Sequence, residues 1–327
     1  MGLENAGFQT VFVNELNDDA RATFLANRHH TLGGKKFAEL SELHCSDVGE
    51  LTRKRLTQLK SDLTNIDDLD IRFGRREQGT LDLLAGGPPC QGFSGIGIRR
   101  SYSVDKKDIP SNQLYRRMAD VIRSLRPRIF LFENVRGLLS AKWTHSETDK
   151  IFPDVLAEFR RIPGYEVRWS LVHAKDYGVP QNRPRVLLVG IRQDILAASK
   201  ILTAGADEED AVACCFLPPP DPNMFPHLDE LLGDLVDPEI GEVLASGDYP
   251  AGKFETRRYP RRPKTNVQKK LREAPSLLPS PVQLTEQEYS RHGRNVVAKF
   301  QFMLANDGEI PRQFRTKKFS QRCLPAI

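Results

Sequence analysis

The residue with the strongest chemical signal is Cys90, which stands at the tip of a rigid turn. It follows 81–85, a short and mostly apolar run that predicts a buried strand. Gly86-Gly87 end this run, and Pro88-Pro89 then hold the backbone at a fixed φ. Open α/β sheets carry out their chemistry just past the carboxyl ends of their strands. A small buried thiol in an ordinary turn is the alternative, but the polar neighbours favour an outward-facing nucleophile.

An acid and three hydrogen-bonding side chains stand at the ends of two later predicted strands. Glu133 ends a strongly apolar run, which predicts that it lies at the same carboxyl edge as Cys90. Gln181, Arg183 and Arg185 alternate ahead of another apolar run, so they point to one side of an extended chain. A capping carboxylate and a solvated strand edge are the alternative interpretations. With a thiol nearby, these residue types suit nucleophilic and acid–base catalysis.

The segments around these residues resemble the motifs of the DNA (cytosine-5) methyltransferases. The run Gly87-Pro-Pro-Cys-Gln-Gly-Phe-Ser94 resembles the family's nucleophile motif, and Phe132-Glu-Asn-Val-Arg-Gly-Leu-Leu-Ser140 resembles its second catalytic motif. Gln181-x-Arg-x-Arg185 resembles a third motif that supports the active site. The resemblance covers residues 1–192 in detail, and beyond them only by position and charge.

This resemblance implies methyl transfer from S-adenosylmethionine to carbon 5 of a cytosine flipped out of the duplex. The Cys90 thiolate is expected to add to carbon 6, which makes carbon 5 electron-rich. Glu133 is expected to be buried and partly protonated, so that it can give a proton or a strong hydrogen bond to ring N3. Arg185 is expected to hold the ring carbonyl oxygen, with Arg183 and Gln181 steadying the strand and loop. No metal ion is expected.

Two acidic residues at predicted strand ends are the expected cofactor contacts. Glu15 ends the β-rich run 10–15, before a helix to about Asn27, where nucleotide-binding α/β folds place an acid for the ribose hydroxyls. Asp47 ends a strand predicted over 41–48, before a helix over 51–63, and by the resemblance accepts a hydrogen bond from the adenine amine. Asp70 has a similar local sequence and stays an alternative. The full set that the resemblance implies for the cofactor is Glu15, Leu16, Asp47, Val48, Gly87, Pro89 and Leu114.

The positive charge of the chain is concentrated in its last quarter. Residues 251–327 contain 17 Lys and Arg against 6 Asp and Glu, whereas residues 1–250 contain 31 against 37. This imbalance favours a polyanionic partner for the basic quarter, with a solvated charged face as the alternative. By position this quarter corresponds to the family's variable target-recognition region. The expected contacts to double-stranded DNA, including the basic loop after Cys90, are Gln91, Ser94, Arg99, Arg257, Arg258, Arg261 and Arg262.

Cysteine usage and hydropathy set the expected compartment. The five cysteines form no C-x-x-C pair, which argues against a structural zinc site and against disulfides, and favours a reducing cytoplasm. No apolar run is long enough to cross a bilayer, and the N-terminus lacks a secretory signal. We expect a cytoplasmic monomer without a membrane partner.

The order of predicted elements indicates an α/β fold. The expected sheet is doubly wound and mostly parallel, as in the Rossmann-like S-adenosylmethionine-dependent methyltransferases, with a smaller basic recognition region beside it. We predict a catalytic domain over 1–200, a Pro-rich linker over 201–223 and a partial target-recognition region over 224–327. The first strand and glycine-rich loop of the family, and its last two segments, are not recognisable. The chain is therefore expected to be truncated at both ends and to bind the cofactor weakly by itself.

The predicted function is DNA (cytosine-5) methylation in a bacterial restriction–modification system, with a cognate restriction endonuclease as a further partner. The tRNA-methylating branch of the same family is an alternative, because it shares the motifs and RNA is as anionic as DNA. A catalytically inactive relative that binds DNA is the other alternative. The intact set of Cys90, Glu133 and Arg185 argues against it.

Overall fold

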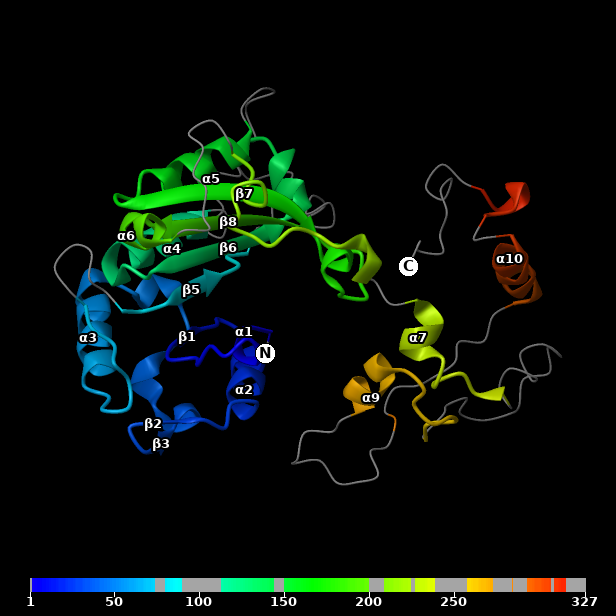
Figure 1. Ribbon diagram of the computed structural model, residues 1–327, viewed down its shortest axis with the longest axis horizontal. Helices are drawn as coiled ribbons and strands as arrows, with labels where there is room; N and C mark the ends of the chain where they lie inside the picture. The colour runs from blue at the N-terminus through cyan, green and yellow to red at the C-terminus, as the bar shows by residue number, and fades with distance from the viewer. Residues whose placement is uncertain are drawn as a thin grey trace. The chain divides into compact units, whose positions relative to one another are not determined.

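A computed structural model describes the chain over residues 2–73, 80–89, 113–143, 150–199, 209–224, 227–238, 258–272, 284, 293–306 and 309–315 (Figure 1). The chain divides into two compact units. The first unit comprises Met1–Val172 and Pro184–Pro219, and the second comprises His173–Arg183 and Pro220–Ile327. The domain boundaries at 200 and 223 stay a prediction.

Short helices and strands alternate up to residue 199, as an α/β fold requires. In chain order they are α1 (Gly2–Asn5), β1 (Val13–Asn14), α2 (Asp18–Ala26), β2 (Thr31–Leu32), β3 (Lys35–Lys36), β4 (His44–Cys45), α3 (Arg53–Thr64), β5 (Leu83–Gly86), α4 (Leu114–Leu125), β6 (Ile129–Val135), α5 (Ile151–Arg160), β7 (Tyr165–His173), β8 (Pro184–Arg192) and α6 (Gln193–Ala198). In the described ranges of the second unit the further α-helices are α7 (Leu228–Leu232), α9 (Asn266–Arg272) and α10 (Arg294–Ala305). None of the helices in the described ranges has the length and apolar character needed to cross a bilayer.

The N-terminal part of the first unit is built on a parallel pair of strands, β1 and β4. Both are shorter than the sequence predicts, and the predicted strand over 41–48 is wrong at its start, because Ser41–Leu43 forms a 3-10 helix. The predicted helix after Glu15 is confirmed as α2. Its N-cap is Asn17, whose side chain accepts a hydrogen bond from the backbone N–H of Ala20.

The larger sheet has four strands in the order β5-β6-β8-β7, as Figure 1 shows. Strand β5 runs parallel to β6, whereas β8 runs antiparallel to β6. The α/β character is confirmed, but the sheet is mixed, so the predicted doubly wound, mostly parallel arrangement is not. The sequence could not give the direction of β8, because a buried strand has the same apolar run in either direction.

Strand β6 is apolar because both of its faces are covered. Phe130 and Phe132 are buried against α4 and α5 on one face, and Ile129 and Leu131 pack against a cluster around residues 211–217 on the other. Gly190 lies opposite Phe130, where an added Cβ would stand 2.0 Å from the Phe130 Cε1 atom, so only glycine fits there. This packing fixes the register of β6 and β8.

The parallel pair β1/β4 and the four-stranded sheet share part of one hydrophobic core. Leu59 and Leu63 of α3 are buried with Val13 of β1, and Leu84 of β5 and Leu125 of α4 pack into the same cluster. Strand β5 and helix α4 therefore connect the two parts of the first unit.

A buried tyrosine gives the first unit a pH-dependent contribution to stability. Tyr165 donates a hydrogen bond to the carbonyl oxygen of Pro127, and burial raises the pKa of Tyr165 to about 12. Its unfolded-state pKa is about 10, so this stabilisation is complete below about pH 10 and is lost as the pH rises towards 12.

We expect Tyr165→Phe to lower the free energy of unfolding at neutral pH by about 1 kcal/mol, because the Pro127 carbonyl loses its donor. Between about pH 10 and 12 this difference should fall by about 1–2 kcal/mol, to zero or with its sign reversed, because only the wild type loses stability by ionising Tyr165. Urea unfolding followed by tryptophan fluorescence measures it, since Trp143 and Trp169 both lie in the first unit. A difference that stays constant over this pH range would contradict the prediction.

Candidate active site

The carboxyl end of β5 lies directly beside that of β6. Gly86 pairs with Phe132, and an added Cβ on the following Gly87 would stand 2.9 Å from the Glu133 Oε2 atom. The next residue is held as well, because the Pro88 carbonyl accepts a 3.2 Å hydrogen bond from the side chain of Asn134. The chain that leads to Cys90 is thus fixed against Glu133 and Asn134, while Cys90 itself lies outside the described residues.

Asn134 is a supporting residue for which the sequence analysis predicted no role. It is only 5% exposed, and its Oδ1 atom also accepts a 2.9 Å hydrogen bond from the backbone N–H of Val135. The available signal was an amide directly after the acid at the end of an apolar strand. Such a residue can tie the next strand end in place by side-chain hydrogen bonds to the backbone.

Glu133 and Arg185 form the central charged pair. In the antiparallel pairing of β6 and β8, Glu133 lies opposite Leu187 and Arg185 lies opposite Val135, so the two side chains are diagonal neighbours on one face. The Arg185 Nε atom is 2.5 Å from Glu133 Oε1. This nitrogen is buried and has no well-aligned hydrogen bond within the described ranges, so the contact is an ion pair.

The Glu133 side chain is more exposed than the sequence predicts. The side chain of Glu133 is 42% exposed and that of Arg185 is 19% exposed. The prediction of a buried carboxyl at Glu133 is therefore wrong in this structure. The carboxylate faces solvent on one side, which leaves room for a reacting group.

Gln181 and Arg183 lie in a turn before β8, and both are exposed. The N–H of Arg183 donates to the carbonyl oxygen of Gln181, and the Arg183 carbonyl accepts from the N–H of Ala174. These residues belong to the second unit, whereas Arg185 belongs to the first. Their support of Glu133 and Arg185 stays a prediction.

Glu15 and Asp47 follow the ends of the two parallel strands β1 and β4. The N–H of Glu15 donates a 3.1 Å hydrogen bond to the Cys45 carbonyl, and Asn14 Nδ2 donates to the carbonyl oxygens of Cys45 and Ser46, both at 3.1 Å. The ends of the two strands are thus tied together. Both acids follow strand ends, as the sequence predicts, and the parallel pairing puts them at one edge of this pair.

Local hydrogen bonds orient the two carboxylates. Glu15 Oε1 accepts from the N–H of Asn17 at 2.9 Å, and Asp47 Oδ1 accepts from the N–H of Gly49 at 2.8 Å. The latter bond caps the 3-10 helix Val48–Glu50. Leu16 adds an apolar side chain that is 72% exposed. Acidic acceptors beside an exposed apolar side chain suit the polar and flat parts of a nucleoside.

Asp70 has no place at this edge. It lies beyond the end of α3, outside any strand, with a side chain that is 83% exposed and paired with Arg72 at 3.0 Å. Of the two alternatives left by the sequence, the geometry favours Asp47 as the adenine contact.

Three more residues expected at the cofactor lie at element ends. Gly87 and Pro89 follow β5, and Leu114 is the first residue of α4. Helix α4 packs on the end of β5, because an added Cβ on Gly86 would stand 3.0 Å from the Met118 Sδ atom. Contact of Gly87, Pro89 and Leu114 with a cofactor stays a prediction.

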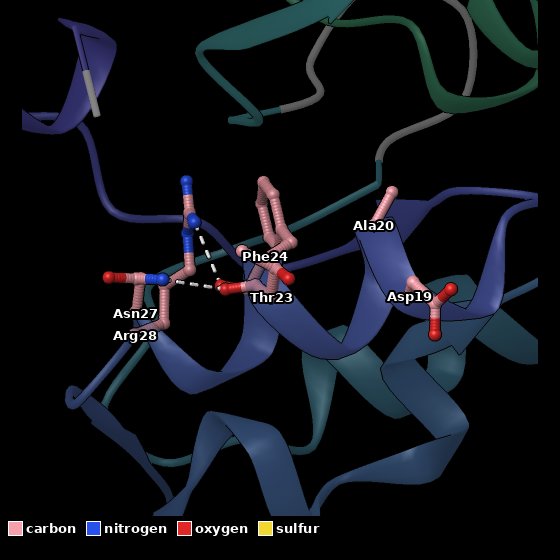
Figure 2. A pocket seen from close by; sticks show the side chains of 6 residues that line it. All are labelled: Asp19, Ala20, Thr23, Phe24, Asn27 and Arg28. Carbon is pink, nitrogen blue, oxygen red and sulfur yellow. Dashed lines mark hydrogen bonds between the residues drawn. The ribbon is translucent and has the colours of Figure 1, made fainter. Parts of the chain in front are cut away.

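A shallow hollow of about 470 Å³ lies on helix α2 (Figure 2). Figure 2 shows its lining residues, which are Asp19, Ala20, Thr23, Phe24, Asn27 and Arg28. The Arg28 guanidinium carbon lies 3.3 Å above the Phe24 ring, and Asn27 Nδ2 donates to the Thr23 carbonyl. None of the predicted site residues that the structure describes lines this hollow, so the candidate site is the set of strand ends rather than this hollow.

The expected DNA contacts divide between described and undescribed parts of the chain. Gln91, Ser94, Arg99 and Arg257 lie outside the described residues. Arg258, Arg261 and Arg262 are exposed and precede α9 in the second unit. Their binding to DNA stays a prediction.

For the methyl transfer that the sequence predicts, we expect Gly87→Ala to lower the rate by up to about 100-fold, because the new Cβ would displace the Glu133 carboxylate and small misplacements of catalytic groups cost about that much. Rates with a labelled methyl donor and a DNA substrate measure the effect. Gly293→Ala is the matched control, since an added Cβ there has no neighbour within 4 Å. Equal rates for the two variants would show that the Gly87 contact is irrelevant to turnover.

Comparison with known proteins identifies the family of this chain. A family model of C-5 cytosine-specific DNA methylases matches residues 1–291. The chain is 31% identical over 209 residues to the type II methyltransferase M.DdeI of Desulfomicrobium norvegicum, covering 64% of this chain and 45% of that protein. It is 31% identical over 256 residues to M.XorII of Xanthomonas oryzae pv. oryzae, covering 77% and 50%.

Among solved structures, the Dnmt2 methyltransferase of S. pombe matches with a TM-score of 0.35 and 16% identity, covering 59% of this chain and 45% of that one. The chain spans about half the length of the curated relatives it matches. Since the family model matches most of the sequence, including the strand ends that carry Glu133 and Arg185, this chain belongs to the C-5 cytosine-specific DNA methylase family.

Proposed function

We propose that this chain forms the catalytic part of a DNA (cytosine-5) methyltransferase that uses S-adenosylmethionine. One observation carries the proposal: Gly87 lies against Glu133, and the Glu133 carboxylate pairs with Arg185, so three strand ends converge beside the chain that leads to Cys90. Nucleophilic catalysis needs a nucleophile, a proton donor and an oxygen-binding group within reach of one reacting ring.

The edge that carries Glu15 and Asp47 fits the cofactor, which supplies an electrophilic methyl group when bound. Glu15 accepts hydrogen bonds from the ribose hydroxyls. Within the described ranges Asp47 Oδ2 accepts no hydrogen bond, so it can receive the adenine amine. Leu16 packs on the flat face of the adenine. The remaining proposed contacts are Val48, Gly87, Pro89 and Leu114.

The chemistry assigned to Cys90 is addition of its thiolate to carbon 6 of cytosine. The electron pair of the ring then moves to carbon 5, and the Glu133 carboxyl, which faces solvent and takes up a proton from it, gives that proton to N3. When carbon 5 takes the methyl group, its own proton passes to solvent, N3 returns its proton to Glu133, and the bond between carbon 6 and sulfur breaks to release the thiolate. The target base must leave the duplex for this reaction.

Arg185 and Glu133 match two neighbouring atoms of the cytosine ring. The ring carbonyl oxygen is next to N3, and the Arg185 guanidinium is 2.5 Å from the Glu133 carboxylate. Arg185 can therefore donate to the carbonyl oxygen while Glu133 faces N3. Gln181 and Arg183 steady the turn before β8, where their backbones are hydrogen bonded to one another.

The proposed substrate is double-stranded DNA, and the protein acts as a monomer. Relatives named type II methyltransferases support a restriction–modification system, with a cognate restriction endonuclease as a partner. Arg257, Arg258, Arg261 and Arg262 are proposed to hold the DNA backbone, with Gln91, Ser94 and Arg99 nearer the target base.

Deleting the gene and then sequencing 5-methylcytosine in genomic DNA and in tRNA tests this function. The expected result is loss of methylation at one recognised DNA sequence, restored by the wild-type gene but not by one with Cys90→Ala. Loss confined to tRNA would assign the chain to the tRNA-methylating branch. Unchanged methylation in both would overturn the proposal.

A further inference from the structure

We propose that Arg272 is a positioning residue that holds the basic segment 258–264 in place to contact the phosphates of duplex DNA, an inference that rests on the proposed function. Six cations in this part of the second unit are exposed: Arg258, Arg261, Arg262, Lys264, Lys269 and Lys270. None of the six forms an ion pair with another described residue. Their charges are therefore available to a polyanion.

Arg272 differs from these six cations because its guanidinium is used inside the unit. Its Nε atom donates a 2.6 Å hydrogen bond to Asp234 Oδ2, and its Nη2 atom lies 2.5 Å from the same oxygen. The side chain of Asp234 is 4% exposed and that of Arg272 is 15% exposed. A nearly buried carboxylate needs such a partner, because an unpaired buried charge is strongly unfavourable.

The same guanidinium also holds the basic segment. Its Nη2 atom donates a 2.6 Å hydrogen bond to the Arg261 carbonyl, and its central carbon lies 3.7 Å above the Tyr259 ring. Arg272 thus connects three pieces: the end of α9, Asp234 just after α7, and the segment that carries Arg258, Arg261 and Arg262.

Helices α7 and α9 give this arrangement a firm base. They pack together in the second unit, where Figure 1 draws them in yellow and orange. Gln268 is 3% exposed; its Oε1 atom accepts from the N–H of Lys264 at 2.7 Å, and its Nε2 atom donates to the Asp229 carbonyl at 3.1 Å. Thr265 Oγ1 donates to the Glu230 carbonyl at 2.6 Å. The basic segment is therefore held at Lys264 by Gln268 and at Tyr259 and Arg261 by Arg272.

One variant distinguishes a positioning role of Arg272 from a direct phosphate contact, because the two roles predict opposite changes in DNA affinity. Asp234→Asn removes a negative charge and releases Arg272. If Arg272 were itself a phosphate contact, DNA binding would tighten. If Arg272 positions the segment, binding weakens by a factor on the order of ten, as expected when several phosphate contacts are lost. Titration of the full chain into a labelled random-sequence duplex at several salt concentrations measures both affinity and salt slope.

Glu309→Gln is the matched control, since it removes the same charge from an exposed acid of the second unit. It should leave DNA affinity unchanged or slightly higher. The variant in which Arg258, Arg261 and Arg262 are all alanine should have a salt slope smaller by about 2.7, at 0.9 for each lost contact. Asp234→Asn should show a smaller slope too, although all six exposed cations are still present.

Tyr259→Leu keeps the buried Asp234–Arg272 pair and so tests the proposal without unfolding this part of the chain. It should weaken DNA binding, whereas Tyr259→Phe, which keeps the ring under the guanidinium, should bind like wild type. Wild-type affinity and salt slope for both Tyr259→Leu and Asp234→Asn would overturn the positioning role alone. If the wild-type chain did not bind the duplex, or bound a tRNA more tightly, the proposed DNA partner would be overturned instead.

Discussion

Cys90→Ala is expected to slow the proposed methyl transfer to DNA by at least about a thousandfold, since without a nucleophile carbon 5 of cytosine stays too electron-poor to accept the methyl group. DNA binding should be nearly unchanged, because a thiol contributes little to holding a phosphate backbone. Initial rates with a labelled methyl donor, and the affinity for a duplex, measure the two effects separately. Cys90→Ala with a near-wild-type rate would disprove the covalent mechanism.

A trapping experiment tests directly whether Cys90 forms a covalent bond to the target cytosine. Duplex DNA with 5-fluorocytosine at the recognised position should form an adduct with the wild type that survives denaturation, because fluorine cannot leave as a proton does. Cys90→Ala should form none. Cys215→Ala is the matched control, since Cys215 is an exposed thiol of the first unit away from the converging strand ends. If Cys215→Ala abolished trapping and Cys90→Ala did not, the nucleophile would be Cys215 rather than Cys90.

Glu133→Gln is expected to slow methyl transfer by about 10²- to 10⁴-fold, the range that a positioned acid or base contributes. The amide fills nearly the same space but cannot give N3 a proton, and it breaks the ion pair with Arg185 that is 2.5 Å long. The rate of fluorocytosine trapping should fall with the rate of turnover, because Glu133 assists the addition step. DNA affinity should stay close to that of the wild type.

Glu158→Gln is the control for loss of a charge and of an ion pair. Glu158 of α5 pairs with Arg123 of α4 at 2.5 Å in the same unit, so this ion pair joins two helices and not the strand ends that carry Glu133. Both variants should lose less than about 1 kcal/mol of stability, since partly exposed ion pairs contribute little. Equal turnover for Glu133→Gln and Glu158→Gln would show that Glu133 takes no part in the reaction.

Local sequence patterns predict several features around the candidate site. The apolar run that ends in Glu133, the glycines and prolines before Cys90 and the capping residue Asn17 each act within a few residues of themselves. Apolar alternation, fixed φ angles and side-chain caps are local interactions. The sequence therefore predicted β5, β6 and α2 with small errors in their bounds, whereas the roles of the site residues stay a prediction.

Only the tertiary structure decided which of these residues meet. The antiparallel direction of β8 places Arg185 diagonally from Glu133, and the pairing of β1 with β4 brings Asp47, rather than Asp70, beside Glu15. Arg272 looked like one more cation of a basic quarter until its contact with the buried Asp234 separated it from the rest. Pairings between residues far apart in the chain depend on how whole elements pack against one another, and no local pattern encodes them.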